Sequence, residues 1–167
     1  MSNKRIAVIT SSIGSNELIS PQKWMHKVDY HAFVEPQYLH IGDMWNRHEY
    51  VSFSLDPKYK NRRDAKIYKV CPHLFLPGYD YYIWMDSTHI LEADPEELIE
   101  KYLKGSEIAV FQHSERDCVY EEGNLVKQIG FDHANLVEDQ LDFYREMQYP
   151  KNNGLYELPV RLQKNNG

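Results

Sequence analysis

The 167-residue sequence has few of the features that mark several common classes of protein. Its two cysteines, Cys71 and Cys118, are far apart and lack the close spacing of zinc ligands, so we expect reduced thiols rather than a disulfide framework. No apolar run approaches the roughly 20 residues of a membrane-spanning helix, which predicts no membrane span. The formal net charge of −6 disfavours nucleic acid and anionic membranes as general partners.

Glycine-rich nucleotide-binding motifs are also missing. Neither G-x-G-x-x-G nor G-x-x-x-x-G-K-[ST] occurs, which excludes the dinucleotide-binding fingerprint and the P-loop. The N-terminal MSNKRIAVIT runs directly into an expected strand and has no signal-peptide pattern, so the sequence predicts a cytoplasmic location. Tyrosine is frequent, with 13 residues, and serves both cores and stacking surfaces for sugars and bases.

Strand and helix patterns alternate along the chain. Apolar and β-branched runs predict strands at residues 4–10, 28–34, 49–55, 81–86 and 107–113, with a further one after 154. Apolar residues at helical spacing predict helices within 63–75, 94–105, 125–129 and 134–148. The alternation predicts one α/β domain over residues 1–167, with a mostly parallel central sheet flanked by helices. No helix pattern follows GLYELPVRLQ, so we expect either a minimal domain or one whose C-terminal part lies outside this sequence.

Local signals refine these elements. Asp94 is the expected N-cap of the helix that starts at Pro95, and Pro72 should end the preceding helix near Cys71. The spacing of Ile67, Val70 and Leu74 predicts the buried face of that earlier helix. Trp84 lies within an apolar strand and is expected in the core.

Polar residues are concentrated where predicted strands end. Thr10, Ser11 and Ser12 follow the first strand, while Asp86 follows the apolar YYIWM. Ligands of open α/β sheets bind beyond the carboxyl ends of the strands. A carboxylate at a buried strand tip is held rigidly and suits a metal ion or a ribose hydroxyl. The alternative is a turn or N-cap residue, although Asp94 already serves the next helix.

Basic residues precede this acidic tip. Arg62, Arg63, Lys66 and Lys69 occupy the helix before Asp86, and helical spacing brings two or three of them onto one face. A departing nucleoside diphosphate needs such positive charge. A solvated helix face is the other reading of the same pattern.

Several segments together resemble a known family. They are similar to the glycosyltransferase-like domain of the TOD/MUCI type, which is related to nucleotide-sugar transferases of the GT-A fold. The segments are RRDAKIYKVCPHLFLPGYDYYIWMDSTHIL, IAVFQHSERDCVYEE and YPKNNGLYELPVRLQKN. The resemblance is good over residues 63–161 and covers the N-terminal part only in layout. It implies a GT-A-like, Rossmann-like fold and a glycosyltransferase that moves sugar from a nucleotide-sugar donor to a glycan or lipid-linked sugar acceptor. We expect the donor to be bound by Arg63, Lys66, Asp86 and Ser87. From layout alone, we expect Thr10, Ser11 and Ser12 at the end of the first strand to hold its base or ribose.

The resemblance also implies a divalent metal, with a departure from the usual pattern. GT-A enzymes carry Asp-x-Asp after a buried strand, whereas this sequence has Asp86-Ser87-Thr88 and lacks the second carboxylate. We expect Asp86 to be the main ligand of Mn²⁺ or Mg²⁺, with His89 as a nitrogen ligand that suits Mn²⁺ better.

The loop after IAVFQ offers candidates for acid–base chemistry. An inverting transferase needs a general base for the acceptor hydroxyl, and His113, Asp117 or Glu121 could serve. A retaining transferase needs no base there, and the sequence does not choose between them. Arg116 either joins the site or pairs with Asp117 or Glu121 to hold the loop. The alternative function is a catalytically inactive nucleotide-sugar or glycan binding domain that has lost its second metal carboxylate.

Overall fold

The computed structural model describes residues 4–15, 18–38 and 41–165. The chain forms two compact units, one comprising Met1–Val110 and Pro159–Gly167, the other Phe111–Leu158. No helix in these described ranges is long and apolar enough to cross a bilayer.

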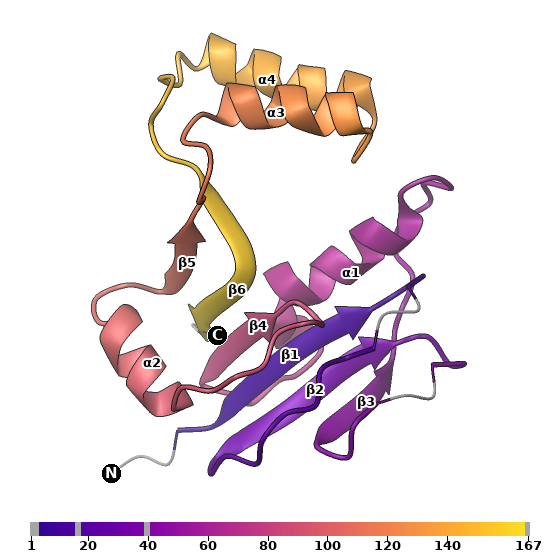
Figure 1. Ribbon diagram of the computed structural model, residues 1–167, viewed down its shortest axis with the longest axis vertical. Helices are drawn as coiled ribbons and strands as arrows, with labels where there is room; N and C mark the ends of the chain where they lie inside the picture. Colours follow the sequence, from indigo (N-terminus) through magenta and orange to yellow (C-terminus); the bar gives the residue numbers. More distant parts are fainter. Residues whose placement is uncertain (1–3, 16–17, 39–40, 166–167) are drawn as a thin grey trace. The chain divides into compact units, whose positions relative to one another are not determined.

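A six-stranded sheet with the order β3-β2-β1-β4-β6-β5 organises the fold (Figure 1). Its strands are β1 (Ile6–Ser12), β2 (Val28–Val34), β3 (Trp45–Glu49), β4 (Tyr81–Met85), β5 (Ile108–Gln112) and β6 (Tyr156–Lys164). β1 runs parallel to β2 and β4, and β2 parallel to β3, whereas β6 is antiparallel to β4. The predicted α/β class with a mostly parallel sheet is confirmed.

The helices begin and end close to several sequence signals. They are α1 (Lys60–Val70), the 3₁₀ turn η1 (Pro72–Leu74), α2 (Pro95–Tyr102), α3 (Val119–Ile129) and α4 (Ala134–Glu146). α1 stops before Pro72, which has no backbone N–H to continue it. The Asp94 carboxylate accepts the N–H groups of Glu96 and Glu97 at 2.8 and 3.1 Å, so it is the N-cap as predicted.

Side chains of the sheet alternate between two buried layers. Ile6 and Val8 pack on one face together with Ile99 of α2. Ala7 and Ile9 pack on the other face with Tyr68 of α1 and with Trp84, which is in the core as expected. The alternation therefore places α1 on the same side of the sheet as Trp84, next to the end of β4.

The third strand differs from its prediction. β3 covers Trp45–Glu49 rather than residues 49–55, and Val51, Phe53 and Leu55 are exposed. The N–H groups of Phe53 and Ser54 donate to Asp64 Oδ1 of α1 at 2.9 and 2.7 Å, so this segment follows the helix instead of a neighbouring strand.

Asp64 is the anchor of that segment and is completely buried. Burial raises the pKa of its carboxyl, but the hydrogen bonds from Lys60, Ser54 and Phe53 outweigh burial and bring the pKa to about 2. Asp64 and Tyr68 are the buried residues of α1, whereas Val70 and Leu74 are exposed. The predicted buried face of this helix is therefore confirmed only at Ile67, which packs partly buried against the core, because Asp64 and Tyr68 take the inner positions.

Two more sequence expectations need adjustment. β5 is a strand as predicted. Its apolar run IAVFQ is typical of a buried strand, but β5 lies at the edge of the sheet with Ile108 and Phe111 about half exposed. α3 begins at Val119, several residues before the predicted 125–129. Both cysteines are free thiols, as expected.

The second unit is built on the contact between α3 and α4. Gly123 of α3 is buried, and a Cβ at this position would lie 2.7 Å from Leu141 Cδ2 of α4. Leu141 is itself buried. Glycine therefore lets the two helices approach at this point.

Candidate functional site

A cavity of about 420 Å³ lies at the carboxyl end of β4, within the first unit. Its lining comes from β1, α1, β4 and the turn after β4, and consists of Ser11, Arg62, Ala65, Lys66, Lys69, Trp84, Asp86, Ser87 and Thr88. This is the edge of a parallel sheet at which ligands bind in open α/β folds. The structure thus brings together Ser11, Lys66, Asp86 and Ser87 from the predicted donor-binding residues.

A larger cavity of about 680 Å³ lies elsewhere in this unit. It includes Tyr81 at the amino end of β4, where open α/β sheets do not place their ligands. Its Lys4 is already paired with Glu100 at 3.1 Å. The smaller cavity is therefore the candidate site.

Three cations of α1 line this smaller cavity. Arg62, Lys66 and Lys69 are spaced four and three residues apart, so they lie on one face of the helix. Only one lining residue, Asp86, is acidic. The formal charge of the lining is thus +2, from three cations and one carboxylate, in a chain whose net charge is −6.

The end of α1 is fixed by a residue that the sequence did not indicate. Arg161 of β6 is buried, and its Nη1 donates to the carbonyl oxygens of Lys69 and Val70 at 2.5 and 3.3 Å. β6 pairs Arg161 with Trp84 of β4. These contacts hold the last turn of α1 beside the tip of β4, because they satisfy helix carbonyls that have no partner within the helix.

Asp86 is at the centre of the cavity's polar contacts. Its Oδ1 accepts hydrogen bonds from Trp84 Nε1 at 2.9 Å and from Lys69 Nζ at 3.3 Å. Its backbone N–H donates to Pro159 O at 2.8 Å, which ties the turn to β6. The Asp86 side chain is 47% exposed, so its carboxylate is both positioned and accessible. Its role toward a donor remains a prediction.

Lys69 forms the inner part of this arrangement. Its side chain is only 18% exposed, and Nζ lies 5.3 Å from the centre of the Trp84 ring. Burial lowers the pKa of Lys69, while the neighbouring Asp86 carboxylate opposes that change. An ammonium between a carboxylate and an aromatic face is electrostatically supported from both sides.

The remaining residues predicted to bind the donor lie outside the cavity lining. Thr10 and Ser12 are buried at positions that alternate with Ser11 along β1, so they belong to the other face of the sheet. Their hydroxyls have no hydrogen-bond partner among the described residues. Arg63 Nη1 pairs with Asp56 Oδ2 at 3.2 Å, and Arg63 lines a separate hollow with Phe53. Arg62, four residues before Lys66, lies on the cavity face of α1 instead of Arg63.

His89, the second predicted metal ligand, is half-buried and is not part of the cavity lining. Its backbone oxygen accepts a hydrogen bond from Gln22 Nε2 at 2.9 Å. In the described part of the chain, no three His, Cys, Asp or Glu side chains cluster in a way that could hold a metal ion. Mn²⁺ or Mg²⁺ binding stays a prediction.

The donor set of the cavity fits a divalent cation poorly. Asp86 is the single carboxylate of the lining, and its partner there is the Lys69 ammonium. A divalent ion about 4 Å from that ammonium would be repelled by roughly 8 kcal/mol at an effective dielectric constant near 20. Ser11, Ser87 and Thr88 offer only hydroxyls, whereas Mg²⁺ and Mn²⁺ prefer carboxylate and phosphate oxygens.

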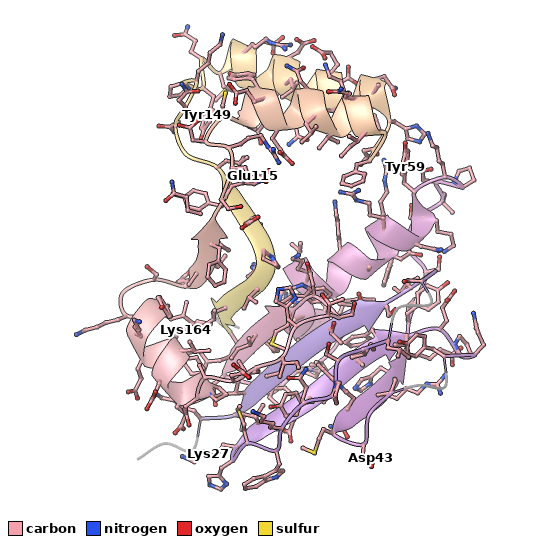
Figure 2. All side chains as sticks on the ribbon, in the orientation of Figure 1. Lys27, Asp43, Tyr59, Glu115, Tyr149 and Lys164 are labelled. Carbon is pink, nitrogen blue, oxygen red and sulfur yellow. The ribbon has the colours of Figure 1, made fainter. Side chains whose placement is uncertain are left out.

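The three predicted catalytic residues, His113, Asp117 and Glu121, belong to the second unit. Asp117 and Glu121 are exposed at the start of α3, just after the loop in which Glu115 is labelled in Figure 2. His113 Nδ1 accepts the N–H groups of Glu115 and Arg116 at 3.1 Å. His113 therefore organises its loop, and the role of all three in catalysis remains a prediction.

Arg116 pairs with acidic neighbours and holds its loop, but these neighbours are Glu122 and Glu115 rather than Asp117 or Glu121. Its Nε donates to Glu122 Oε2 at 2.7 Å, and its Nη1 to Glu115 Oε2 at 3.1 Å. Its Nη2 lies 3.1 Å from His113 Nε2, so Arg116 also contacts the imidazole that organises this loop.

The mostly parallel sheet, with a charged cavity at the end of its buried β4, defines a glycosyltransferase-like fold of the GT-A type, as comparison with known proteins confirms. Residues 39–159, well over half of the chain, match the family described as the TOD1/MUCI70 glycosyltransferase-like domain. The chain belongs to this family, and the predicted resemblance is confirmed.

A solved structure with a similar fold is the apo form of mouse xyloside xylosyltransferase 1. The match covers 96% of this chain and 67% of the mouse protein, with a TM-score of 0.51 and 13% sequence identity. Identity this low shows the fold alone. No curated protein matches the chain.

Proposed function

We propose that this chain is a glycosyltransferase domain that transfers a sugar from a nucleotide-sugar donor to a hydroxyl group of its acceptor. The observation that carries the proposal is the cavity at the end of β4, whose lining contains Arg62, Lys66 and Lys69 together with a single carboxylate, Asp86. Membership of a glycosyltransferase-like family supports it. A glycan or a lipid-linked sugar is the proposed class of acceptor.

The residues match the charge changes of the reaction. A bond forms between the acceptor oxygen and the anomeric carbon, while the bond between that carbon and the phosphate oxygen breaks and leaves its electron pair on the departing diphosphate. Arg62, Lys66 and Lys69 stabilise this growing negative charge, because they are positioned before the reaction begins. The accessible Asp86 carboxylate accepts a hydrogen bond from a hydroxyl group of the nucleotide sugar. The acceptor's proton goes to a base, for which His113, Asp117 and Glu121 remain the candidates in an inverting reaction.

A second candidate function is a catalytically inactive domain that binds nucleotide sugars. One observation favours it: Asp86, the only acidic residue in the cavity lining, is already paired with Lys69 and is poorly suited to act as a base. In that case the same cavity binds the donor without cleaving it.

The test measures binding and cleavage separately. Calorimetry with uridine, guanosine, adenosine and cytidine diphosphates, and with their sugar conjugates, should detect at least one ligand. Replacement of Arg62 and Lys66 by Met should weaken this binding about tenfold or more, because each lost charge-assisted contact costs 1.4 kcal/mol or more. Lys101→Met is the matched control, since Lys101 is exposed on α2 and absent from the cavity lining.

Chromatographic detection of released nucleoside diphosphate separates the two functions. Release that depends on Arg62 and Lys66 supports a transferase, and tight binding without release supports the binding domain. If no nucleotide or nucleotide sugar binds in any buffer, both proposals fail.

A further inference from the structure

The carboxylate at the tip of β4 already has a cation beside it, and that cation belongs to the protein. Lys69 Nζ lies 3.3 Å from Asp86 Oδ1, and Trp84 Nε1 donates to the same oxygen at 2.9 Å. Among the described residues, both hydrogen bonds to this carboxylate go to Oδ1. An ammonium group therefore already neutralises this carboxylate, and a divalent ion bound to either of its oxygens would be repelled by that ammonium.

This ammonium is held in place by several independent contacts. Arg161 Nη1 donates to the backbone carbonyl oxygen of Lys69 at 2.5 Å and so fixes the backbone there. The Trp84 ring lies beside the Lys69 ammonium. The Lys69 side chain is largely buried, yet it belongs to the lining of the cavity. A lysine on the outer surface of α1 would have none of these restraints.

The charge of the lining points in the same direction. A metal site needs an excess of anionic oxygen donors, whereas this lining has three cations and one carboxylate, and its other polar side chains are three hydroxyls and the Trp84 indole N–H. The phosphates of a donor carry several negative charges, and cations bind them directly. The cavity is therefore suited to an anionic diphosphate without an intervening metal ion.

We propose that Lys69, together with Arg62 and Lys66, neutralises the donor's diphosphate in place of a divalent cation, so that nucleotide binding by this domain is independent of metal. Asp86 then has the task of orienting the Lys69 ammonium, through Oδ1, toward the phosphates. This inference rests on the proposed function, because it concerns how the same cavity holds its donor.

The first experiment uses the unaltered protein and therefore does not depend on whether any variant folds. Calorimetric titration with uridine, guanosine, adenosine and cytidine diphosphates is performed in EDTA and again with Mn²⁺. We expect the affinity of the bound nucleotide to differ by less than about twofold between the two buffers. Binding that appears only with Mn²⁺ overturns this inference and leaves the proposed function intact, whereas no binding in either buffer defeats the proposed function itself.

The second experiment removes the charge of Lys69. In EDTA, Lys69→Met should bind the nucleoside diphosphate about tenfold or more weakly, since it retains the apolar stem but loses the ammonium. Lys69→Arg keeps a cation and should retain most of the affinity, and Lys101→Met should bind like the unaltered protein. Normal binding by Lys69→Met in EDTA overturns the role assigned to Lys69.

Discussion

Acidification should destabilise the first unit through His31, a buried residue of β2 that is only 7% exposed. Its Nδ1 lies 2.8 Å from His48 Nε2, and its Nε2 lies 2.8 Å from Tyr79 Oη. Tyr79 donates its hydroxyl proton to Asp29 Oδ2 at 2.8 Å. The chain is satisfied when His48 Nε2–H donates to a neutral His31, whose Nε2–H donates to Tyr79.

The size of the effect follows from the pKa of His31. Burial, reinforced by the neighbouring His48 and Arg5, lowers this pKa from 6.5 to about 4, although Asp29 opposes the change. Between these two values the unfolded chain binds a proton that the folded chain does not. The free energy of unfolding is therefore at its full value above 6.5 and falls as the pH drops toward 4, by about 3 kcal/mol in all.

Urea denaturation across this pH range measures the loss. Because many carboxyl groups also titrate at low pH, the comparison is with His31→Gln, which removes this one proton-linked group. The variant is expected to be less stable at neutral pH but to lose about 3 kcal/mol less on acidification. His26→Gln is the matched control, since His26 is exposed, and should behave like the unaltered protein. Equal pH dependence for His31→Gln and the unaltered protein would refute the reasoning.

Three further predictions concern other contacts. Asp64→Ala should lower the free energy of unfolding by about 2–4 kcal/mol, because it leaves two backbone N–H groups and Lys60 without their acceptor; a thermal or urea midpoint close to the original contradicts this. Gly123→Ala should cost about 1–3 kcal/mol through crowding against Leu141, and Leu141→Ala should partly relieve that cost in the double variant, which a double-mutant cycle measures. Asp86→Asn should weaken nucleoside diphosphate binding about tenfold while the melting temperature changes little; calorimetry that finds equal affinity speaks against the site.

Much of the fold was predictable because several signals agreed at each element. β1 and β4 are apolar, β-branched or aromatic runs, and α2 has both an N-cap at Asp94 and a glycine stop at Gly105, whose φ of +82° favours glycine. The strand predicted at residues 49–55 was wrong because its alternating pattern also fits an exposed segment. What decided its structure was the distant carboxylate of Asp64, which no local pattern reveals.

The candidate site was predictable at the level of its position but not of its contacts. The sequence has Asp86 at the end of a buried strand and basic residues in the preceding helix. This pattern predicted the position of the cavity that the structure contains. Which cations reach it depends on the rotation of α1 about its axis, and this rotation is set by Asp64 and Tyr68 inside the core. Arg161 could not be found from the sequence, because its contact with α1 links residues 92 positions apart.

The place of β6 in the sheet has a consequence for how this domain emerges from the ribosome. β6 pairs with β4 along the edge opposite β1. The residues of β6 that belong to the first unit begin at Pro159, so residues 111–158 must be synthesised before them. Until then β4 has an open edge, and the last turn of α1 lacks the guanidinium that secures it. We therefore expect a nascent chain that stops short of Arg161 to have a loosened α1 and an incomplete cavity at the end of β4, so this cavity forms among the latest parts of the domain.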